Sequence, residues 1–107
     1  MIAAIPVMND NKEAQLSLKF ARSPFFALVD REFNTYRFIK NPFADDESGV
    51  GPKILSLLCE ENAVGSFVAF ELGLKLQQHA KSKGLQFIIL NENNNRLVDI
   101  LKLMGLE

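Results

Sequence analysis

The chain has 107 residues, of which 48% are hydrophobic and 23% charged, and this is the composition of one ordinary globular domain covering residues 1–107. That composition excludes a disordered chain and a fibrous repeat, and the single cysteine, Cys59, excludes a disulfide scaffold. Twelve basic and thirteen acidic residues give a formal charge of -1, which argues against nucleic acid as a partner.

The chain is expected to begin directly in a strand. Residues 1–7 form a nearly continuous apolar run, which is typical of a strand buried on both faces. Loop-forming residues end this strand, namely Asn9, Asp10 and Asn11. A short alternating piece follows at residues 16–20, and a period of two would put three apolar side chains on one side, Leu16, Leu18 and Phe20.

Two further strands are predicted at residues 25–30 and 35–40. The four residues between them have the right length for a hairpin, and Asn34 tolerates a positive φ. The second run alternates polar and apolar side chains, which indicates one solvated face and a place near the edge of the sheet. The first half of the chain is therefore a meander.

The second half alternates helices and strands. After the irregular segment 41–51, Pro52 suits the first turn of a helix that ends near Asn62. Residues 65–70 form a strand, residues 73–83 form a helix that Gly84 closes, and residues 85–90 form the last strand. Residues 91–95 supply a loop and the N-cap of a final helix. Its apolar stripe consists of Leu97, Val98, Ile100, Leu101 and Met104, and Gly105 closes it.

This order predicts an α/β fold. Strands that alternate with helices lie parallel with right-handed crossovers, so one mixed sheet with helices packed on it is the simplest assembly. No apolar run approaches the roughly 18 residues that span a bilayer, and the N-terminus lacks the basic start of a signal peptide. A cytoplasmic protein without membrane contact is expected.

A site is expected beyond the carboxyl ends of the parallel strands. Residues 9–11, 71–73 and 91–95 follow three of those strands, and the loop 45–51 reaches the same face. Three carboxylates there would form a cluster for a divalent metal, Asp10, Glu71 and Glu92. The alternative, and the commoner role of such residues, is that each is an ordinary turn or cap residue.

Basic residues offer a different chemistry at the same edge. The candidate cations are Lys19, Arg22 and Lys75, and Gly49 to Gly51 before a helix would offer backbone N–H groups to an anion. Solvated surface charges and a flexible loop are the alternatives. His79 lies in a polar run of a helix and is expected in solvent, whereas Cys59 is expected to be a small buried thiol.

Several motifs, in order and spacing, resemble those of the dinitrogenase iron-molybdenum cofactor biosynthesis family, the nitrogenase accessory factor-like proteins. The opening MIAAIPVMNDN resembles the first strand and turn of that family, and LKFARSPFF at residues 18–26 resembles its H-F-G-R-A-P-Y-F motif. Asn41-Pro42 with ESGVG at residues 47–51 resembles its N-P and H-G-A-G segment. VAFELGLK at residues 68–75 resembles its I-A-G-G-I-G-P-K loop. The resemblance covers essentially the whole chain.

The resemblance implies a ribonuclease H-like motif fold with a five-stranded mixed sheet and the element order βββαβαβα. It implies a non-enzymatic domain that binds or carries an iron-molybdenum or iron–sulfur cofactor. The positions that it assigns to cofactor binding here are Asn9, Asp10, Lys19, Arg22, Ser48, Gly49, Glu71, Gly73 and Lys75.

The departures from the family pattern indicate a divergent member. Lys19 and Ser48 stand where the motifs have His, so the usual imidazole ligands for a metal are missing. Phe70 and Glu71 replace paired glycines, and the ring of Phe70 is expected to fill part of the pocket. The positions of the pattern that remain are expected to hold an anionic ligand electrostatically, namely Arg22, Gly49, Gly51, Gly73 and Lys75.

Three functions follow from these patterns. The first is a carrier domain for a cluster or another anionic small molecule. The second is a protein-interaction or regulatory module with a degenerate pocket, which pairs with a partner or a second copy through the edge strand at residues 35–40. The third is a metal-dependent hydrolase that uses the three carboxylates.

Overall fold

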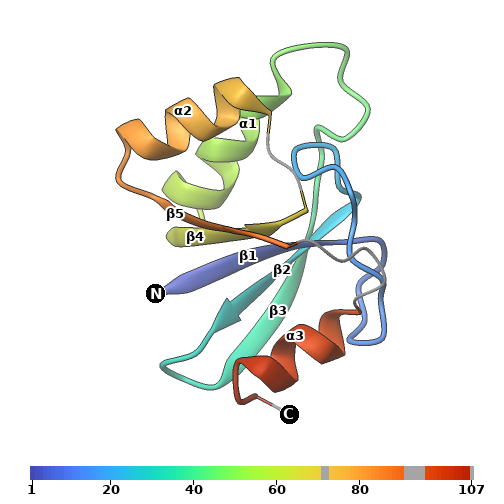
Figure 1. Ribbon diagram of the computed structural model, residues 1–107. Helices are drawn as coiled ribbons and strands as arrows, with labels where there is room; N and C mark the ends of the chain where they lie inside the picture. The colour runs from blue at the N-terminus through green and yellow to red at the C-terminus, as the bar shows by residue number, and fades with distance from the viewer. Residues whose placement is uncertain (71–72, 91–95, 107) are drawn as a thin grey trace.

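The computed structural model describes residues 1–70, 73–90 and 96–106, and in these ranges a five-stranded mixed sheet lies between two layers of helix (Figure 1). The helix α1 continues directly into a π-helical segment, η1. The chain order is β1 (Ile2–Val7), β2 (Phe25–Asp30), β3 (Thr35–Lys40), α1 (Val50–Leu55), η1 (Ser56–Glu60), β4 (Val64–Ala69), α2 (Leu74–Ser82), β5 (Gln86–Ile89) and α3 (Leu97–Leu103). The predicted α/β class and the order βββαβαβα are confirmed.

The strand order across the sheet is β3-β2-β1-β4-β5. Antiparallel pairing joins β1 to β2 and β2 to β3, and parallel pairing joins β1 to β4 and β4 to β5. The predicted hairpin is confirmed, with Asn34 at φ 54 in the turn and β3 at an edge. Because of these directions, the carboxyl ends of β1, β3, β4 and β5 all lie at one edge of the sheet.

Each face of the sheet carries its own apolar core, because the side chains of a strand alternate between faces. Figure 1 shows α1 and α2 on one face and α3 on the other. Phe26 and Phe67 lie in the core under α1 and α2, and Ile5 and Val7 lie in the core under α3. These side chains are fully buried, and each contributes about 1.5–3 kcal/mol to folding. No helix in the described ranges has the length and apolar character needed to cross a membrane.

The central strand β1 changes neighbours halfway along its length. Its ladder with β4 reaches only to Ala4, and beyond that point the segment 15–17 takes the place of β4. Ser17 donates its backbone N–H to the carbonyl of Pro6 over 2.9 Å, and Leu16 forms a bridge with Val7. Pro6 has no N–H to donate to a neighbouring strand. It is tolerated in this central strand because the edge of β1 on which that N–H would lie faces the inserted segment, and no ladder with β4 is formed there.

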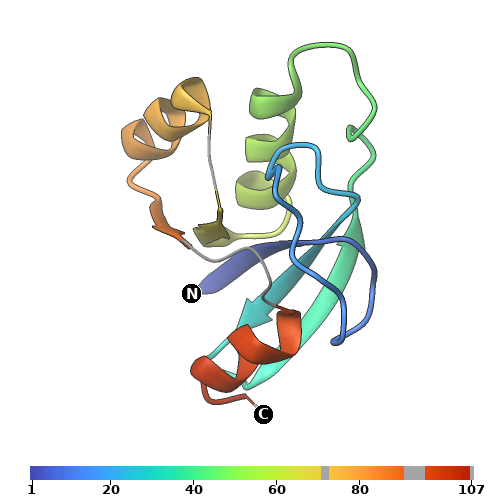
Figure 2. The same cartoon turned by 45° about the vertical axis from the view of Figure 1, so that its right-hand side comes forward.

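The segment between β1 and β2 crosses the edge of the sheet from the α3 side to the α1 side, as Figure 2 shows. Leu16 belongs to the core under α3, and Phe20 belongs to the core under α1 and α2. The predicted alternation, with Leu16, Leu18 and Phe20 on one side, is therefore wrong. Leu18 lies at the crossing point and is 53% exposed.

The N-terminus of α3 is held by main-chain groups. Leu97 and Val98 donate their backbone N–H groups to the carbonyls of Ala14 and Lys12, over 2.9 and 2.8 Å. The N-cap residue is Arg96, whose backbone N–H donates to the carboxylate of Asp99. The N-cap predicted within residues 91–95 is wrong, because neighbouring carbonyls already satisfy the first N–H groups of the helix. Residues 91–95 themselves lie outside the described ranges.

Candidate functional site

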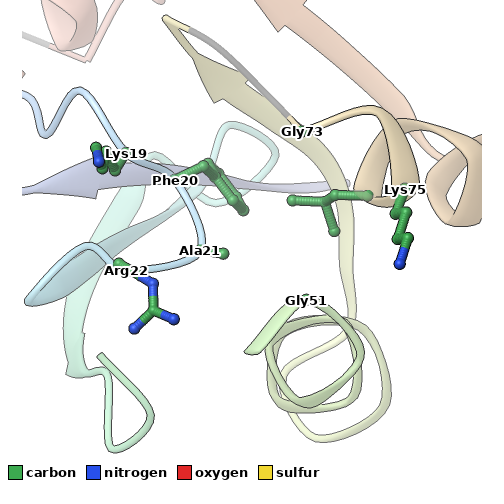
Figure 3. A pocket seen from close by; sticks show the side chains of 8 residues that line it. Lys19, Phe20, Ala21, Arg22, Gly51, Gly73 and Lys75 are labelled. Atoms are coloured by element: carbon green, nitrogen blue, oxygen red, sulfur yellow. The ribbon is translucent and has the colours of Figure 1, made fainter. Parts of the chain in front are cut away.

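A cavity of about 350 Å³ lies at the edge of the sheet where the parallel strands end. Three segments that are distant in the sequence form it: the stretch before β2, the first turn of α1 and the start of α2 (Figure 3). Its described lining consists of Lys19, Phe20, Ala21, Arg22, Gly51, Gly73, Lys75 and Leu76. Three of these side chains are basic and none is acidic, so the described lining of the cavity attracts anions.

A buried asparagine fixes the stretch that carries Lys19 and Arg22. Asn41 is only 4% exposed, and its Nδ2 donates to the carbonyls of Ala21 and Ser23 over 3.0 and 2.8 Å. Its Oδ1 accepts the backbone N–H of Phe43 over 2.9 Å. The hydroxyl of Ser23, also buried, contacts the carbonyls of Val7 and Phe25. The cavity wall is thus tied to the ends of three strands.

The ring of Phe20 forms the floor of this cavity. Phe20 is buried, and its centroid lies 4.9 Å from that of Phe67 and 5.2 Å from that of Phe26. This packing anchors the loop on the sheet, while Lys19 and Arg22 nearby in the sequence remain exposed. The predicted position of Phe70 is wrong, because Phe70 packs in the core under α3, on the opposite face from Phe20.

Some of the hydrogen-bond donors of Arg22 are already used within the protein. Its Nη1 donates to the carbonyls of Ala44 and Asp46 over 3.1 and 2.7 Å, and its Nη2 donates to the carbonyl of Glu47 over 3.4 Å. A guanidinium has five N–H groups, so donors remain for a ligand while these bonds hold the loop before α1. Lys53 reinforces the same loop through a 2.6 Å ion pair with Asp46.

The opposite wall comes from the start of α2. Gly73 precedes the helix in an extended conformation, and Lys75 follows in the first turn. In Figure 3 the side chains of Arg22 and Lys75 lie on either side of Gly51. A Cβ added at Gly51 or Gly73 would meet no atom within 4 Å, so both glycines border open space. Backbone N–H groups at a helix start favour negative charge.

Two neighbouring cavities share lining residues with this one. One shares Lys19 and Arg22 with it and extends toward Met8 and Leu18, with a volume of about 500 Å³. The other, of about 410 Å³, shares Gly51 and Lys75 with it. The residues that line more than one of these cavities are therefore Lys19, Arg22, Gly51, Lys75 and Leu76.

The residues assigned to cofactor binding from the sequence fall into three groups. Lys19, Arg22, Gly73 and Lys75 lie together around the cavity, and Gly49 borders the adjoining one. Asn9, Asp10 and Ser48 are exposed, and they line neither of these two cavities. Glu71 lies outside the described residues, as does Glu92 of the predicted carboxylate cluster. In the part of the chain that is described, His, Cys, Asp and Glu form no group of three that could hold a metal ion.

Sequence reasoning did not assign Phe20, Asn41 or Leu76 to the site. A buried Asn looks the same in the sequence as a surface Asn, and its only signal was its place in the Asn-Pro pair. Phe20 and Leu76 read as ordinary apolar positions, because the pattern of one segment does not tell which other segment will face it.

The soft metal ligands of the chain lie away from the cavity floor. Cys59 is half-buried against the core under α1 and α2. Burial raises the pKa of the Cys59 thiol, the positive charge of Lys83 opposes this rise, and Glu60 adds to it. The thiol is therefore mostly protonated at neutral pH. His79 is exposed on α2, as expected, and borders the adjoining cavity.

A family model described as dinitrogenase iron-molybdenum cofactor matches residues 1–104 of this chain. The comparison of this chain with curated proteins found no match.

Solved structures share the fold at low identity. The apo form of the orange protein from Desulfovibrio gigas is 17% identical, with a TM-score of 0.83, and the match covers 98% of this chain and 88% of that one. The crystal structure of PH0822 is 23% identical, with a TM-score of 0.76 and coverages of 98% and 91%. A NifB-like protein of the DUF35 family from Thermotoga is 22% identical, with a TM-score of 0.76 and coverages of 97% and 85%.

Proposed function

The chain belongs to the dinitrogenase iron-molybdenum cofactor family, and from this premise we propose that it is a small non-enzymatic domain that binds and carries an anionic metal–sulfur cofactor. The cargo would be an iron-molybdenum or iron–sulfur cluster, seated in the cavity between Lys19, Arg22 and Lys75. The observation that carries the proposal is the basic cavity at the carboxyl edge of the sheet. The apo form of a similarly folded protein, the orange protein, adds support, since an apo form implies a bound one.

The residues around the cavity fit an anion better than a metal ion bound by side chains. Cys59 and His79 are the best soft ligands of the chain, and neither lines the cavity described above. Lysine and arginine do not coordinate metals, but charge-assisted hydrogen bonds from them hold oxyanions and sulfide-rich anions. The protein would therefore hold an assembled cluster by charge, backbone N–H groups and shape.

Each lining residue has a separable task in this proposal. Lys19 and Lys75 supply mobile point charges, whereas the planar guanidinium of Arg22 directs its remaining donors from a fixed position. Phe20 closes the cavity against the core, which excludes water from beneath the ligand. Gly51 and Gly73 leave the room that the ligand takes up.

Uptake of tetrathiomolybdate, a coloured anion of molybdenum and sulfur, tests the proposal. The protein is purified without oxygen, mixed with the anion and desalted, and retained metal is measured by absorption and elemental analysis. The triple variant Lys19→Gln, Arg22→Gln, Lys75→Gln should lose this uptake. The matched control Lys40→Gln, Lys81→Gln, Lys102→Gln changes the same charge at exposed sites on β3, α2 and α3. Uptake that is equal in both triple variants would contradict the proposal.

Reconstitution with ferrous iron and sulfide tests the iron–sulfur form of the cargo. The variant Cys59→Ser should take up as much colour as the unaltered chain, because the thiol is not part of the cavity. Loss of colour in Cys59→Ser would instead indicate thiolate coordination. A colourless, metal-free protein in both experiments would remove the carrier function.

Pairing through a sheet edge is a second candidate function. The edge strand β3 exposes Arg37 and Lys40, and charges on an edge oppose pairing with another chain. The other edge strand, β5, has no charged residue, and its Ile88 and Ile89 are 57% and 43% exposed. Light scattering over a range of concentrations tests this, with Ile88→Lys as the variant. A monomer at every concentration would contradict it.

A further inference from the structure

The cavity of about 410 Å³ that adjoins the binding cavity runs between the first turn of α1 and the exposed face of α2. Its lining consists of Gly49, Val50, Gly51, Pro52, Lys75, Leu76 and His79. Three of these residues also line the binding cavity, namely Gly51, Lys75 and Leu76. The two cavities therefore adjoin each other at the start of α2, with Lys19 and Arg22 lining the binding cavity and His79 lining the adjoining one, which we call the groove.

The spacing of Lys75 and His79 puts both side chains on the same face of α2. Residues four apart in an α-helix lie one turn from each other, and this helix covers Leu74–Ser82. Leu76 and Ala80 bury the neighbouring face in the core, which fixes the rotation of the helix. Contacts from Ser82 Oγ and the Lys83 N–H go to the backbone carbonyl of His79, so they do not engage its ring.

The wall that faces Lys75 and His79 has little side-chain bulk. A Cβ added at Gly49 or Gly51 would meet no atom within 4 Å. Val50 is buried, and the described lining of this cavity includes no carboxylate. Lys53 is the cation of α1, and it pairs with Asp46; neither residue belongs to the described lining of this cavity. An anionic group that entered here would meet Lys75 and the imidazole without an opposing negative charge from this lining.

We propose that the groove between α1 and α2 is a second anion subsite, in which Lys75 and His79 bind the far end of an elongated ligand. This inference rests on the proposed anion-binding function, and it adds that the ligand is elongated. The ligand has one anionic group between Lys19 and Arg22 and another at His79. The imidazole of His79 has an N–H that it can donate to such a group.

Inorganic phosphates of increasing length provide the test: phosphate, pyrophosphate and tripolyphosphate, titrated by calorimetry at constant pH and ionic strength. The His79→Gln variant should bind tripolyphosphate roughly five- to tenfold more weakly and phosphate unchanged, because one charge-assisted hydrogen bond is lost only with the longer anion. The matched control is Lys81→Gln, an exposed cation on the same helix that lines neither cavity. A loss of tripolyphosphate affinity in Lys81→Gln equal to that in His79→Gln would overturn the subsite, since it would reflect net charge alone.

The imidazole resonances give an independent readout. The chain has a single His, so these signals belong to His79 without assignment. Tripolyphosphate should shift them, and phosphate at the same occupancy should not. Binding of tripolyphosphate that leaves both the resonances and the His79→Gln affinity unchanged would overturn the subsite while keeping the proposed function. Binding of no anion, including tetrathiomolybdate, would overturn the proposed function and the subsite together.

Discussion

Nη1 of Arg22 donates a 2.7 Å hydrogen bond to the backbone carbonyl of Asp46, a residue 24 positions further along the chain. This bond connects the stretch before β2 with the loop before α1, and both segments contribute to the cavity. One side chain therefore shapes the loop and presents charge to the site.

Replacement of Arg22 separates these two tasks. Arg22→Gln should weaken tetrathiomolybdate uptake and lower the free energy of unfolding by about 1–2 kcal/mol, because hydrogen bonds to the loop carbonyls are lost. Arg22→Lys keeps the charge without the planar fork, so it should retain uptake better than it retains stability. Urea unfolding and metal analysis measure the two quantities. Arg31→Gln, at an exposed turn position, is the control, and equal effects of Arg22→Gln and Arg31→Gln would refute this role.

Asn41 should contribute more to stability than any surface asparagine. Asn41→Ala leaves the carbonyls of Ala21 and Ser23 and the N–H of Phe43 without their partner, at a cost of about 2–3 kcal/mol in the free energy of unfolding. Asn41→Asp keeps the acceptor for Phe43 but cannot donate, so it should also destabilise the fold. Thermal unfolding followed by circular dichroism measures both. An Asn41→Ala variant as stable as the unaltered chain would contradict the anchoring role.

A side chain at Gly51 should fill the groove without harm to the fold. Gly51→Leu points into open space from a backbone conformation that any residue adopts, and leucine favours a helix over glycine. We expect uptake of tetrathiomolybdate and binding of tripolyphosphate to fall at least tenfold, while the free energy of unfolding stays equal or rises. Unchanged anion binding in a folded Gly51→Leu variant would show that the ligand lies elsewhere.

Gly49 provides the matched contrast to Gly51. Its φ of 71 lies in the left-handed region, so Gly49→Ala should destabilise the fold by about 1–2 kcal/mol although the space around it is open. The same urea titration that follows Gly51→Leu measures this difference. Equal stabilities of Gly49→Ala and Gly51→Leu would contradict it.

The raised pKa of Cys59 predicts slow alkylation and a loss of stability in alkali. Burial disfavours the thiolate in the folded state, so iodoacetamide should react more slowly with the folded chain than with the urea-unfolded chain at about pH 8. The thiol stays protonated in both states at lower pH, so its stabilising effect is fully present there. As pH rises above the ordinary thiol pKa of about 8.5, the unfolded state ionises first and stability falls. Cys59→Ala should flatten this alkaline decline, and an unchanged decline would contradict the assignment to Cys59.

Local sequence patterns were sufficient to predict the order of the helices and strands and the family. The hairpin with Asn34, the closing glycines Gly84 and Gly105 and the exposed edge strand follow from short-range rules, because turn geometry and side-chain alternation are properties of neighbouring residues. Motif order indicated the family that the comparison over residues 1–104 then showed. Neither the single His nor the single Cys belongs to the lining of the binding cavity.

Where segments that are distant in sequence meet was decided only by the tertiary structure. Leu16 and Phe20 are four residues apart, yet they enter opposite cores, because the chain crosses the sheet edge between them. The prediction that the ring of Phe70 fills part of the pocket was wrong for a related reason. The sequence does not show on which of the two faces of the sheet, under α1 and α2 or under α3, a ring packs. Lys19, Gly51 and Lys75 form one cavity because β1, β3 and β4 end at the same edge, and that follows from strand order. The sequence by itself determined the type and order of the elements, their bounds to within about two residues, and the family to which the chain belongs. Long-range packing of the two cores determined which side chains face each other.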